Sequence, residues 1–215
     1  MSHDLVLAGG AGKRLDRKSF VAYFRNRRHY EVGEVGNGQA VYQHEDTGVS
    51  FIFDEPEDGL VMFNLNYFRP HVFGLDAAVE LEDFSKAFDA RVTDPQEGTD
   101  GAAFSREDFL RSWNAGNQFA YRSLLKEQTE PVFTWPGRRI RKVWEWNYTR
   151  PPDEEREAQT LFVPGIFAVE IEGEARSVAI WPPDCAILLP AADAVLVPCE
   201  PRGKTSEDLA LVTWD

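Results

Sequence analysis

The pattern of apolar and polar positions is clearest between Leu60 and Asp94, where it predicts a strand, a corner, a helix and a second strand. Alternate side chains of a strand point to opposite faces of a sheet. One face of the first strand is therefore expected to be apolar, and it carries Val61, Phe63, Leu65 and Tyr67. Pro70 lacks the N–H that a central strand needs, so this strand is expected to end near Arg69.

The helix predicted after this corner is amphipathic. Asp76 is expected to be its N-cap, because a carboxylate accepts hydrogen bonds from N–H groups that have no partner inside a helix. Spacings of four, three and four residues place one buried stripe on the helix, formed by Ala77, Leu81, Phe84 and Phe88. The solvated side carries Glu80, Glu82, Asp83 and Lys86. Asp94-Pro95 is expected to close the strand that follows.

The chain before residue 60 predicts one helix and a set of antiparallel strands. The helix begins after Asp16, which serves as its cap. Asn37-Gly38 is a strong signal for a tight hairpin, which would join strands near residues 30–35 and 40–43. A further strand is expected over residues 49–53, and it leads into an acidic turn.

A longer helix is predicted from Ser105 onwards, because Ser105 and Asp108 have the spacing of a helix-capping pair. Its apolar stripe consists of Phe109, Trp113, Ala120 and Leu124. Gly116 and Asn117 are poor helix formers in the middle of this helix. Either a close helix–sheet crossing or a polar contact is expected there, and close packing is the preferred interpretation.

The pattern changes around residues 129–137, which suggests two units, 1–128 and 129–215. Ile140, Lys142, Trp144, Trp146 and Tyr148 alternate and predict a strand in the second unit. Further strands are expected at 161–171 and 175–181, joined around Glu172-Gly173-Glu174, and at 187–189, 194–198 and 209–212. The predicted fold class is α+β: an antiparallel sheet with helices packed on one face, followed by a smaller β-rich C-terminal unit packed against the first.

Composition narrows the possible partners. The 43% of hydrophobic residues suit a chain with a real core, and the formal net charge is −13. A charge of that sign repels phosphates, which argues against nucleic acid and membrane surfaces and favours a basic protein partner. No leader and no apolar run of about 20 residues is seen, so a cytoplasmic protein is expected. Cys185 and Cys199 are expected to be reduced there, with a disulfide left open.

One short motif, Leu7 to Leu15, could bind a phosphate. It resembles the start of the sugar-nucleotide and molybdopterin nucleotidyltransferases, in which a strand leads into a glycine-rich loop that holds a nucleoside triphosphate. The resemblance covers about nine residues. It implies that the backbone N–H groups of Gly9, Gly10 and Gly12 approach phosphates and that Lys13 or Arg14 neutralises their charge. The family has an alternating α/β order, whereas this chain predicts a helix followed by hairpins.

Other candidate groups have weaker patterns. The histidines, His3, His29, His44 and His71, are scattered without the spacing of a metal site, and no metal or cofactor is predicted. Arg69 and His71 flank Pro70 and could line an anion pocket, although an ion pair of Arg69 with a nearby acid is preferred. Four tryptophans, Trp135, Trp144, Trp146 and Trp181, could form a sugar- or partner-binding surface, and packing inside the protein is preferred for Trp144 and Trp146.

The sequence therefore favours a non-enzymatic, acidic binding protein. Its most concrete form is an immunity-type inhibitor, as in bacterial toxin–antitoxin pairs, that covers the active site of a basic toxin. The predicted partner-binding residues are Glu80, Glu82, Asp83, Asp54, Glu55, Glu57, Asp58 and Trp135. The alternative is an enzyme for a nucleotide or another phosphorylated ligand that uses Gly9, Gly10, Gly12, Lys13, Arg14, Arg69 and His71. A scaffold subunit of a larger assembly is the second alternative, and the oligomeric state is left open.

Overall fold

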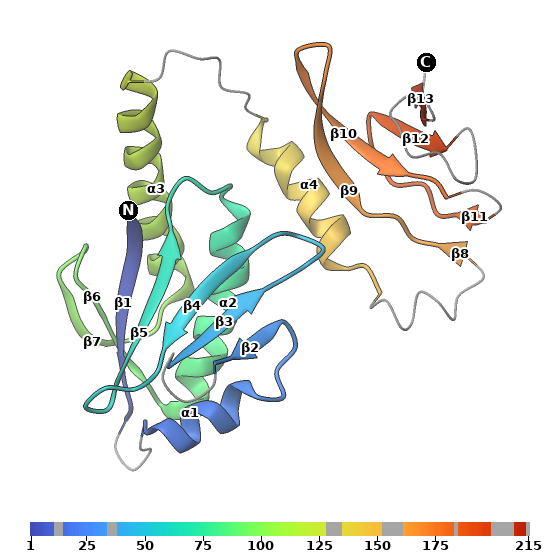
Figure 1. The fold of residues 1–215 in the computed structure, drawn as a ribbon. Coiled ribbons are helices and arrows are strands. Elements are labelled where there is room, and N and C mark those ends of the chain that lie inside the picture. Colours follow the sequence, from blue (N-terminus) through green and yellow to red (C-terminus); the bar gives the residue numbers. More distant parts are fainter. Residues whose placement is uncertain are drawn as a thin grey trace. The chain divides into compact units, whose positions relative to one another are not determined.

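The computed structural model describes residues 1–10, 15–33, 38–127, 135–151, 161–182, 185–198 and 209–213 (Figure 1). The chain divides into two compact units, Met1–Glu130 and Pro131–Asp215. A seven-stranded antiparallel sheet with helices forms the first unit, and smaller sheets form much of the second. The predicted α+β class is confirmed. That the second unit packs against the first stays a prediction.

The first unit is built on the seven-stranded sheet. Its elements in chain order are β1 (Ser2–Ala8), α1 (Arg17–Phe24), β2 (Tyr30–Val32), β3 (Gln39–Gln43), β4 (Ser50–Asp54), β5 (Leu60–Asn66), α2 (Val72–Phe88), β6 (Arg91–Asp94), β7 (Thr99–Ala103) and α3 (Arg106–Glu127). The strands lie in the order β2-β3-β4-β5-β1-β6-β7, and every neighbouring pair is antiparallel. The first strand of the chain therefore lies inside the sheet, between β5 and β6.

The core of this unit lies between one face of the sheet and the helices, as expected (Figure 1). The alternation on β5 is confirmed, because Val61, Phe63 and Leu65 are fully buried. Phe53 of β4 contacts Phe24 of α1 and Phe84 of α2, with ring centroids 5.1 and 5.2 Å away. Aromatic rings at these distances gain packing energy beyond their buried area. They therefore fix both helices to the same face.

The start of α2 differs from the prediction. His71, not Asp76, occupies the N-cap position, and Asp76 is buried inside the helix. The helix starts earlier because the corner already turns the backbone: Phe73 N–H donates to the Pro70 carbonyl, and Gly74 N–H donates to the His71 carbonyl. The predicted apolar stripe of α2 is confirmed, since Ala77, Leu81, Phe84 and Phe88 are all buried.

The corner after β5 is held by α3. Phe68 has a left-handed backbone, with φ of 62°. The Asn117 side chain accepts a hydrogen bond from Phe68 N–H at 2.8 Å and donates one to the Arg69 carbonyl at 2.7 Å. A Cβ at Gly116 would overlap the hydroxyl of Tyr67. The close packing and the polar contact that were alternatives for this part of α3 are thus both present, on adjacent residues.

The other two predicted helices of this unit begin at their predicted caps, and the predicted apolar stripe of α3 is buried except at its end. Asp16 caps α1 and forms a reciprocal pair with Ser19, as its position predicts. Ser105 accepts a hydrogen bond from Asp108 N–H at the start of α3. The predicted stripe of α3 is buried at Phe109, Trp113 and Ala120, but Leu124 is 43% exposed because the buried face of the helix ends before its last turn.

The second unit contains a helix where a strand was predicted. Its elements are α4 (Gly137–Tyr148), β8 (Leu161–Phe162), β9 (Ile166–Ile171), β10 (Glu174–Ile180), β11 (Ala186–Ile187), β12 (Ala194–Pro198) and β13 (Leu209–Thr213). The strand predicted over residues 140–148 is wrong. Val143 and Trp146 pack against the buried cluster at Ile166, and the Asn147 side chain forms two hydrogen bonds of 2.9 Å with the Ile166 backbone. Spacings of three and four residues select a helix.

The strands of the second unit largely follow the prediction. β9 and β10 form an antiparallel hairpin whose turn residues Glu172 and Gly173 have positive φ. β13 pairs with β12 at one edge of the four-stranded sheet, as expected for the tail. Cys185 forms no disulfide, and Cys199 lies outside the described residues. Across the ranges described above, no helix is both long enough and apolar enough to cross a membrane.

Candidate functional site

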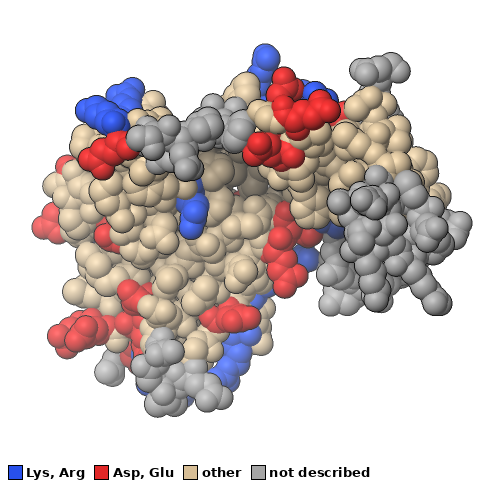
Figure 2. Space-filling view, turned by 45° about the horizontal axis from the view of Figure 1, so that its top comes forward, with Lys and Arg blue, Asp and Glu red and all other residues tan. Residues whose placement is uncertain are grey.

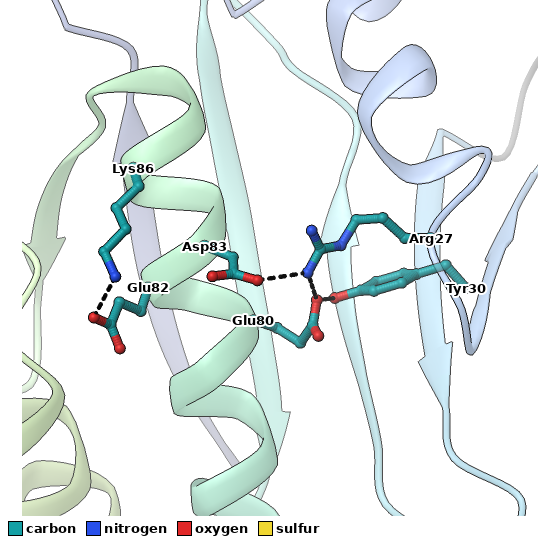
Figure 3. A network of polar contacts seen from close by, with 6 residues as sticks. All are labelled: Arg27, Tyr30, Glu80, Glu82, Asp83 and Lys86. Carbon is teal, nitrogen blue, oxygen red and sulfur yellow. Dashed lines mark hydrogen bonds and ion pairs between the residues drawn. The ribbon is translucent and has the colours of Figure 1, made fainter. Parts of the chain in front are cut away.

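The predicted acidic face of α2 forms ion pairs with cations of the same chain (Figure 3). Arg27 donates to Glu80 at 2.8 Å and to Asp83 at 3.0 Å, and the Tyr30 hydroxyl donates to Glu80 at 3.0 Å. Burial lowers the pKa of Arg27, but its hydrogen bonds to the two carboxylates outweigh this effect and raise the pKa above its ordinary value. Arg27 also lies over the ring of Tyr23, 4.9 Å from its centroid.

The remaining acid of this face is also paired. Lys86 donates to Glu82 at 2.6 Å, and Arg106 lies 3.9 Å from the same carboxylate. The hydrogen bond from Lys86 lowers the pKa of Glu82. Because the acids of α2 face nearby cations, this surface carries little net charge.

The acidic turn between β4 and β5 keeps more of its charge. Asp58 and Gly59 have φ of 52° and 83°, and two backbone hydrogen bonds between Glu57 and Leu60 close a tight hairpin around them. Positive φ at both central residues is typical of a type I′ turn, for which Asp-Gly is a preferred pair. The turn therefore holds Asp58 in a fixed, exposed position.

Two of the four acids in this turn have partners. Arg17 of α1 pairs with Glu55 at 2.8 Å, and Gln39 donates to Asp54 at 2.8 Å. Glu57 and Asp58 are exposed, and neither has a cationic partner among the residues that the structure describes. One cation against four acids leaves this turn the more negative of the two predicted acidic surfaces.

Trp135 belongs to the second unit and is engaged within it. Its indole N–H donates to the Ala175 carbonyl at 2.8 Å. The guanidinium of Arg139 lies over its ring, 4.6 Å from the centroid. These contacts fix the orientation of Trp135 inside its own unit.

The glycine-rich motif is described only at its start. Gly10 N–H donates to the Phe88 carbonyl at 3.1 Å, and a Cβ at Gly10 would overlap the Asp89 backbone and side chain. Gly10 is thus required where β1 passes the end of α2. Gly12, Lys13 and Arg14 lie outside the described residues.

A cavity of about 570 Å³ lies beside Gly9, and Asp16, Arg17 and Asp58 line it as well. Arg17 is paired with Glu55. Two carboxylates facing one cation that is already paired do not favour a phosphate.

The described residues of the ligand-binding alternative lie at opposite ends of the paired strands β1 and β5. Ala8 pairs with Leu60 and Ser2 pairs with Asn66. Gly9 therefore leaves the sheet at one end of β1, and Arg69 leaves it at the other, roughly 20 Å away at the usual rise of a strand. Arg69 lies over the ring of Phe73, 5.8 Å from its centroid. Gly9 and Arg69 are therefore well separated, and whether the loop binds a phosphate stays a prediction.

A buried network of polar side chains, formed by His3, Asp94, Tyr67 and Ser112, was not predicted. His3 is fully buried, its Nε2 lies 3.4 Å from Asp94 Oδ2, and its Nδ1 lies 3.4 Å from the Tyr67 hydroxyl. Ser112 of α3 donates to the same Asp94 oxygen at 3.0 Å. Burial lowers the pKa of His3 although Asp94 acts to raise it. This network joins β1, β6 and α3 inside the core, where a ligand cannot reach the imidazole of His3.

Comparison with known proteins gives no relative: no family model matches the chain, and neither does any curated protein or solved structure. Among the described residues, no three His, Cys, Asp or Glu side chains are grouped so that they could hold a metal ion. The geometry on which a function can be argued is therefore that of the surfaces and cavities themselves.

Proposed function

We propose that the chain is a non-enzymatic binding protein that covers a basic protein partner. The most concrete form of the proposal is an immunity-type inhibitor that occludes the active site of a basic toxin, such as a nuclease or a deaminase. The observation that carries it is the excess of acids over the whole chain, 36 Asp and Glu against 23 Lys and Arg. Complementary charge accelerates association with a basic partner and suppresses wrong partners.

The excess is present in both units. Residues 1–130 carry 22 acids and 14 Lys or Arg, and the remaining residues carry 14 acids and nine. In the view of Figure 2, Asp and Glu side chains lie in several separate groups on the surface. The negative electrostatic potential of the whole chain attracts a basic partner before the two proteins touch. It therefore supports recognition of such a partner even though the acids of α2 are internally paired.

The best local candidate for contact is the β4–β5 turn surface, which we define as Asp54, Glu55, Glu57, Asp58, Leu60 and Met62. Leu60 and Met62 are 43% and 39% exposed on the outer face of β5, directly after the acidic turn. Protein interfaces commonly combine an apolar centre with a charged rim. The rigid I′ turn adds preorganised carboxylates, which lose little conformational freedom on binding.

The test begins with affinity capture of the protein encoded by the neighbouring gene, at about 50 mM and about 500 mM salt. A basic partner should bind with an association rate that falls steeply as salt increases. The double variant Glu57→Gln with Asp58→Asn should slow association by roughly three- to tenfold. Addition of the wild-type chain should abolish the enzymatic activity of that partner.

The matched control removes two acids elsewhere. Glu170→Gln with Glu172→Gln changes exposed side chains of the β9–β10 hairpin and makes the same change in net charge. If both double variants slow association equally, the turn surface is not the contact. A stable partner whose activity is unchanged in the complex would refute the inhibitor proposal and favour a scaffold subunit.

A further inference from the structure

The second unit contains a cavity of about 580 Å³ between α4 and the loop that precedes β12. Its lining includes Arg139, Lys142 and Val143 of α4 and Leu189 and Ala192 of that loop. Cavities of 300 to 1,000 Å³ lined mostly by apolar groups, with a few placed polar groups, are typical of small-molecule sites. This cavity lies wholly within one unit.

A fixed polar cluster forms one side of the cavity. The Asp193 carboxylate accepts hydrogen bonds from Ser177 N–H at 2.7 Å and from the Ser177 hydroxyl at 2.8 Å. It also forms an ion pair with Arg139, whose guanidinium lies over the ring of Trp135. The charges of Asp193 and Arg139 therefore compensate each other, and the cluster is held in one arrangement.

Lys142 is left as the uncompensated charge of the cavity. It lies one turn beyond Arg139 on α4, is exposed, and has no anionic partner among the residues that the structure describes. Of the apolar residues that line the cavity, Leu189 is 39% exposed and Val143 is partly buried. A single ammonium group at the rim of an apolar hollow is complementary to one negative charge attached to an apolar body.

The surrounding charge supports an anionic ligand in spite of the negative net charge of the chain. The first half of α4 carries Arg138, Arg139, Arg141 and Lys142 and no acid. Glu145 compensates Arg141 through a contact of 2.9 Å. Among the residues that the structure describes, this leaves Arg138 and Lys142 as the cations of α4 without an anionic partner. At about 0.1 M salt, charges more than roughly 10 Å away are largely screened, so nearby cations matter more at the cavity than the net charge of the chain.

We propose that this cavity binds a small organic monocarboxylate, with the carboxylate at Lys142 and an aliphatic or aromatic body against Val143 and Leu189. A multiply charged ligand such as a nucleotide fits less well, because Arg139, the one guanidinium among the described residues that line the cavity, is paired with Asp193. The proposal does not depend on the proposed inhibitor function, because it concerns the second unit alone.

The probe is octanoate, titrated into the full-length protein and followed by calorimetry and by ¹H–¹⁵N NMR. Saturable binding of one octanoate is expected, with a Kd on the order of 1 mM for a ligand of this size. The amide signals of Ser177 and Asp193 should shift along the titration. Octylamine has the same chain with the opposite charge and should not bind saturably.

Two substitutions locate the site, and a third is their control. Lys142→Gln should weaken octanoate binding by about fivefold. Leu189→Glu should abolish it, since it removes apolar wall and adds a like charge at an exposed position. Arg138→Gln removes one positive charge from the same helix at a residue that does not line the cavity, and it should leave the Kd within about twofold.

Several results would overturn the proposal. They are a lack of saturable octanoate binding, equal binding of octylamine, an equal loss in Lys142→Gln and Arg138→Gln, or signal shifts that lie outside the cavity. Lys142 and Arg138 are exposed, so both variants should remain folded, and circular dichroism checks this. The comparison between them therefore stays decisive even if Leu189→Glu is unstable.

Discussion

His29 and His44 stack face to face, with ring centroids 4.0 Å apart and planes inclined by 14°. His44 is 5% exposed. Burial lowers the pKa of both imidazoles, and Arg28 lowers it further, whereas Asp46 acts to raise it. The pKa of His44 falls to about 4. Two positive charges at this distance would repel each other, so the stacked arrangement disfavours protonation of both rings.

The stability of the first unit should therefore fall in mild acid. The native pKa of His44 lies below the value near 6.5 of an unfolded chain, so the unfolded state takes up a proton first as the pH falls. The free energy of unfolding should decrease by roughly 2 kcal/mol between pH 6.5 and pH 4 and change little from this source below pH 4. Urea denaturation at half-unit steps of pH measures this dependence.

A histidine substitution separates this effect from general acid denaturation. His44→Gln should flatten the pH dependence between pH 6.5 and pH 4, whereas His71→Gln at the cap of α2 should keep it. NMR titration of the ring protons gives the pKa of His44 directly. A value near 6.5 would contradict the prediction.

Asn117 should be far more important for stability than its neighbour on the same helix. Asn117→Ala removes the hydrogen bonds to Phe68 N–H and the Arg69 carbonyl and leaves both backbone groups without that partner. The expected loss is about 2–3 kcal/mol of unfolding free energy, measured by urea denaturation. Asn114→Ala is the matched control: its exposed side chain donates to the Leu110 carbonyl of its own helix, so a change near zero is expected. Equal effects would show that Asn117 does not hold the corner.

Gly116 should behave opposite to a helix glycine that faces solvent. Gly→Ala in an exposed helix position normally stabilises a protein by up to about 1 kcal/mol. At Gly116 the new Cβ would overlap the Tyr67 hydroxyl, so destabilisation is expected instead. In the Tyr67→Ala background, Gly116→Ala should become neutral or stabilising, and a double-mutant cycle measures this coupling. A stabilising single Gly116→Ala variant would refute the close approach.

The Arg27 network should contribute more than the ion pair beside it on α2. Arg27 is largely shielded from solvent, and its loss leaves Glu80 and Asp83 close together without their shared cation. Arg27→Ala should therefore cost about 1–2 kcal/mol of unfolding free energy. Lys86→Ala breaks only an exposed pair and should have little effect, because water and salt screen such pairs. A thermal denaturation series at low and high salt distinguishes the two.

Local sequence patterns were sufficient to predict an element where only one periodicity or one capping residue fits the sequence. The strand at Val61–Leu65 has a single consistent alternation, and Asp16 has its reciprocal partner Ser19 three residues later. At residues 140–148 two periods compete. Aromatic residues at every second position suggest a strand, while Val143, Trp146 and Asn147 fit a helix. The packing of Val143 and Trp146 and the contact of Asn147 with Ile166, nineteen residues away, favour the helix, and these contacts are not visible in the local pattern.

The arrangement of the candidate site residues could be predicted even less well, because it depends on contacts between residues distant in the sequence. The sequence shows acids at Glu80 and Asp83 but not that Arg27 neutralises them from more than fifty residues away. It shows Gly9 and a Pro70 corner but not that the antiparallel pairing of β1 with β5 places them at opposite ends of these strands. The turn at Asp58-Gly59 is the exception, because its backbone geometry follows from those two residues alone.

The inner position of β1 also determines when this unit can fold during its synthesis on the ribosome. Leu5 pairs with Phe63 and Leu7 pairs with Val92, so neither hydrogen-bonding edge of the strand finds its neighbour until those residues have left the ribosome. A segment made early must wait unpaired for segments made much later. Contacts so distant in sequence slow folding and expose strand edges in the meantime. During translation, the nascent chain is therefore most open to aggregation before residue 94 emerges.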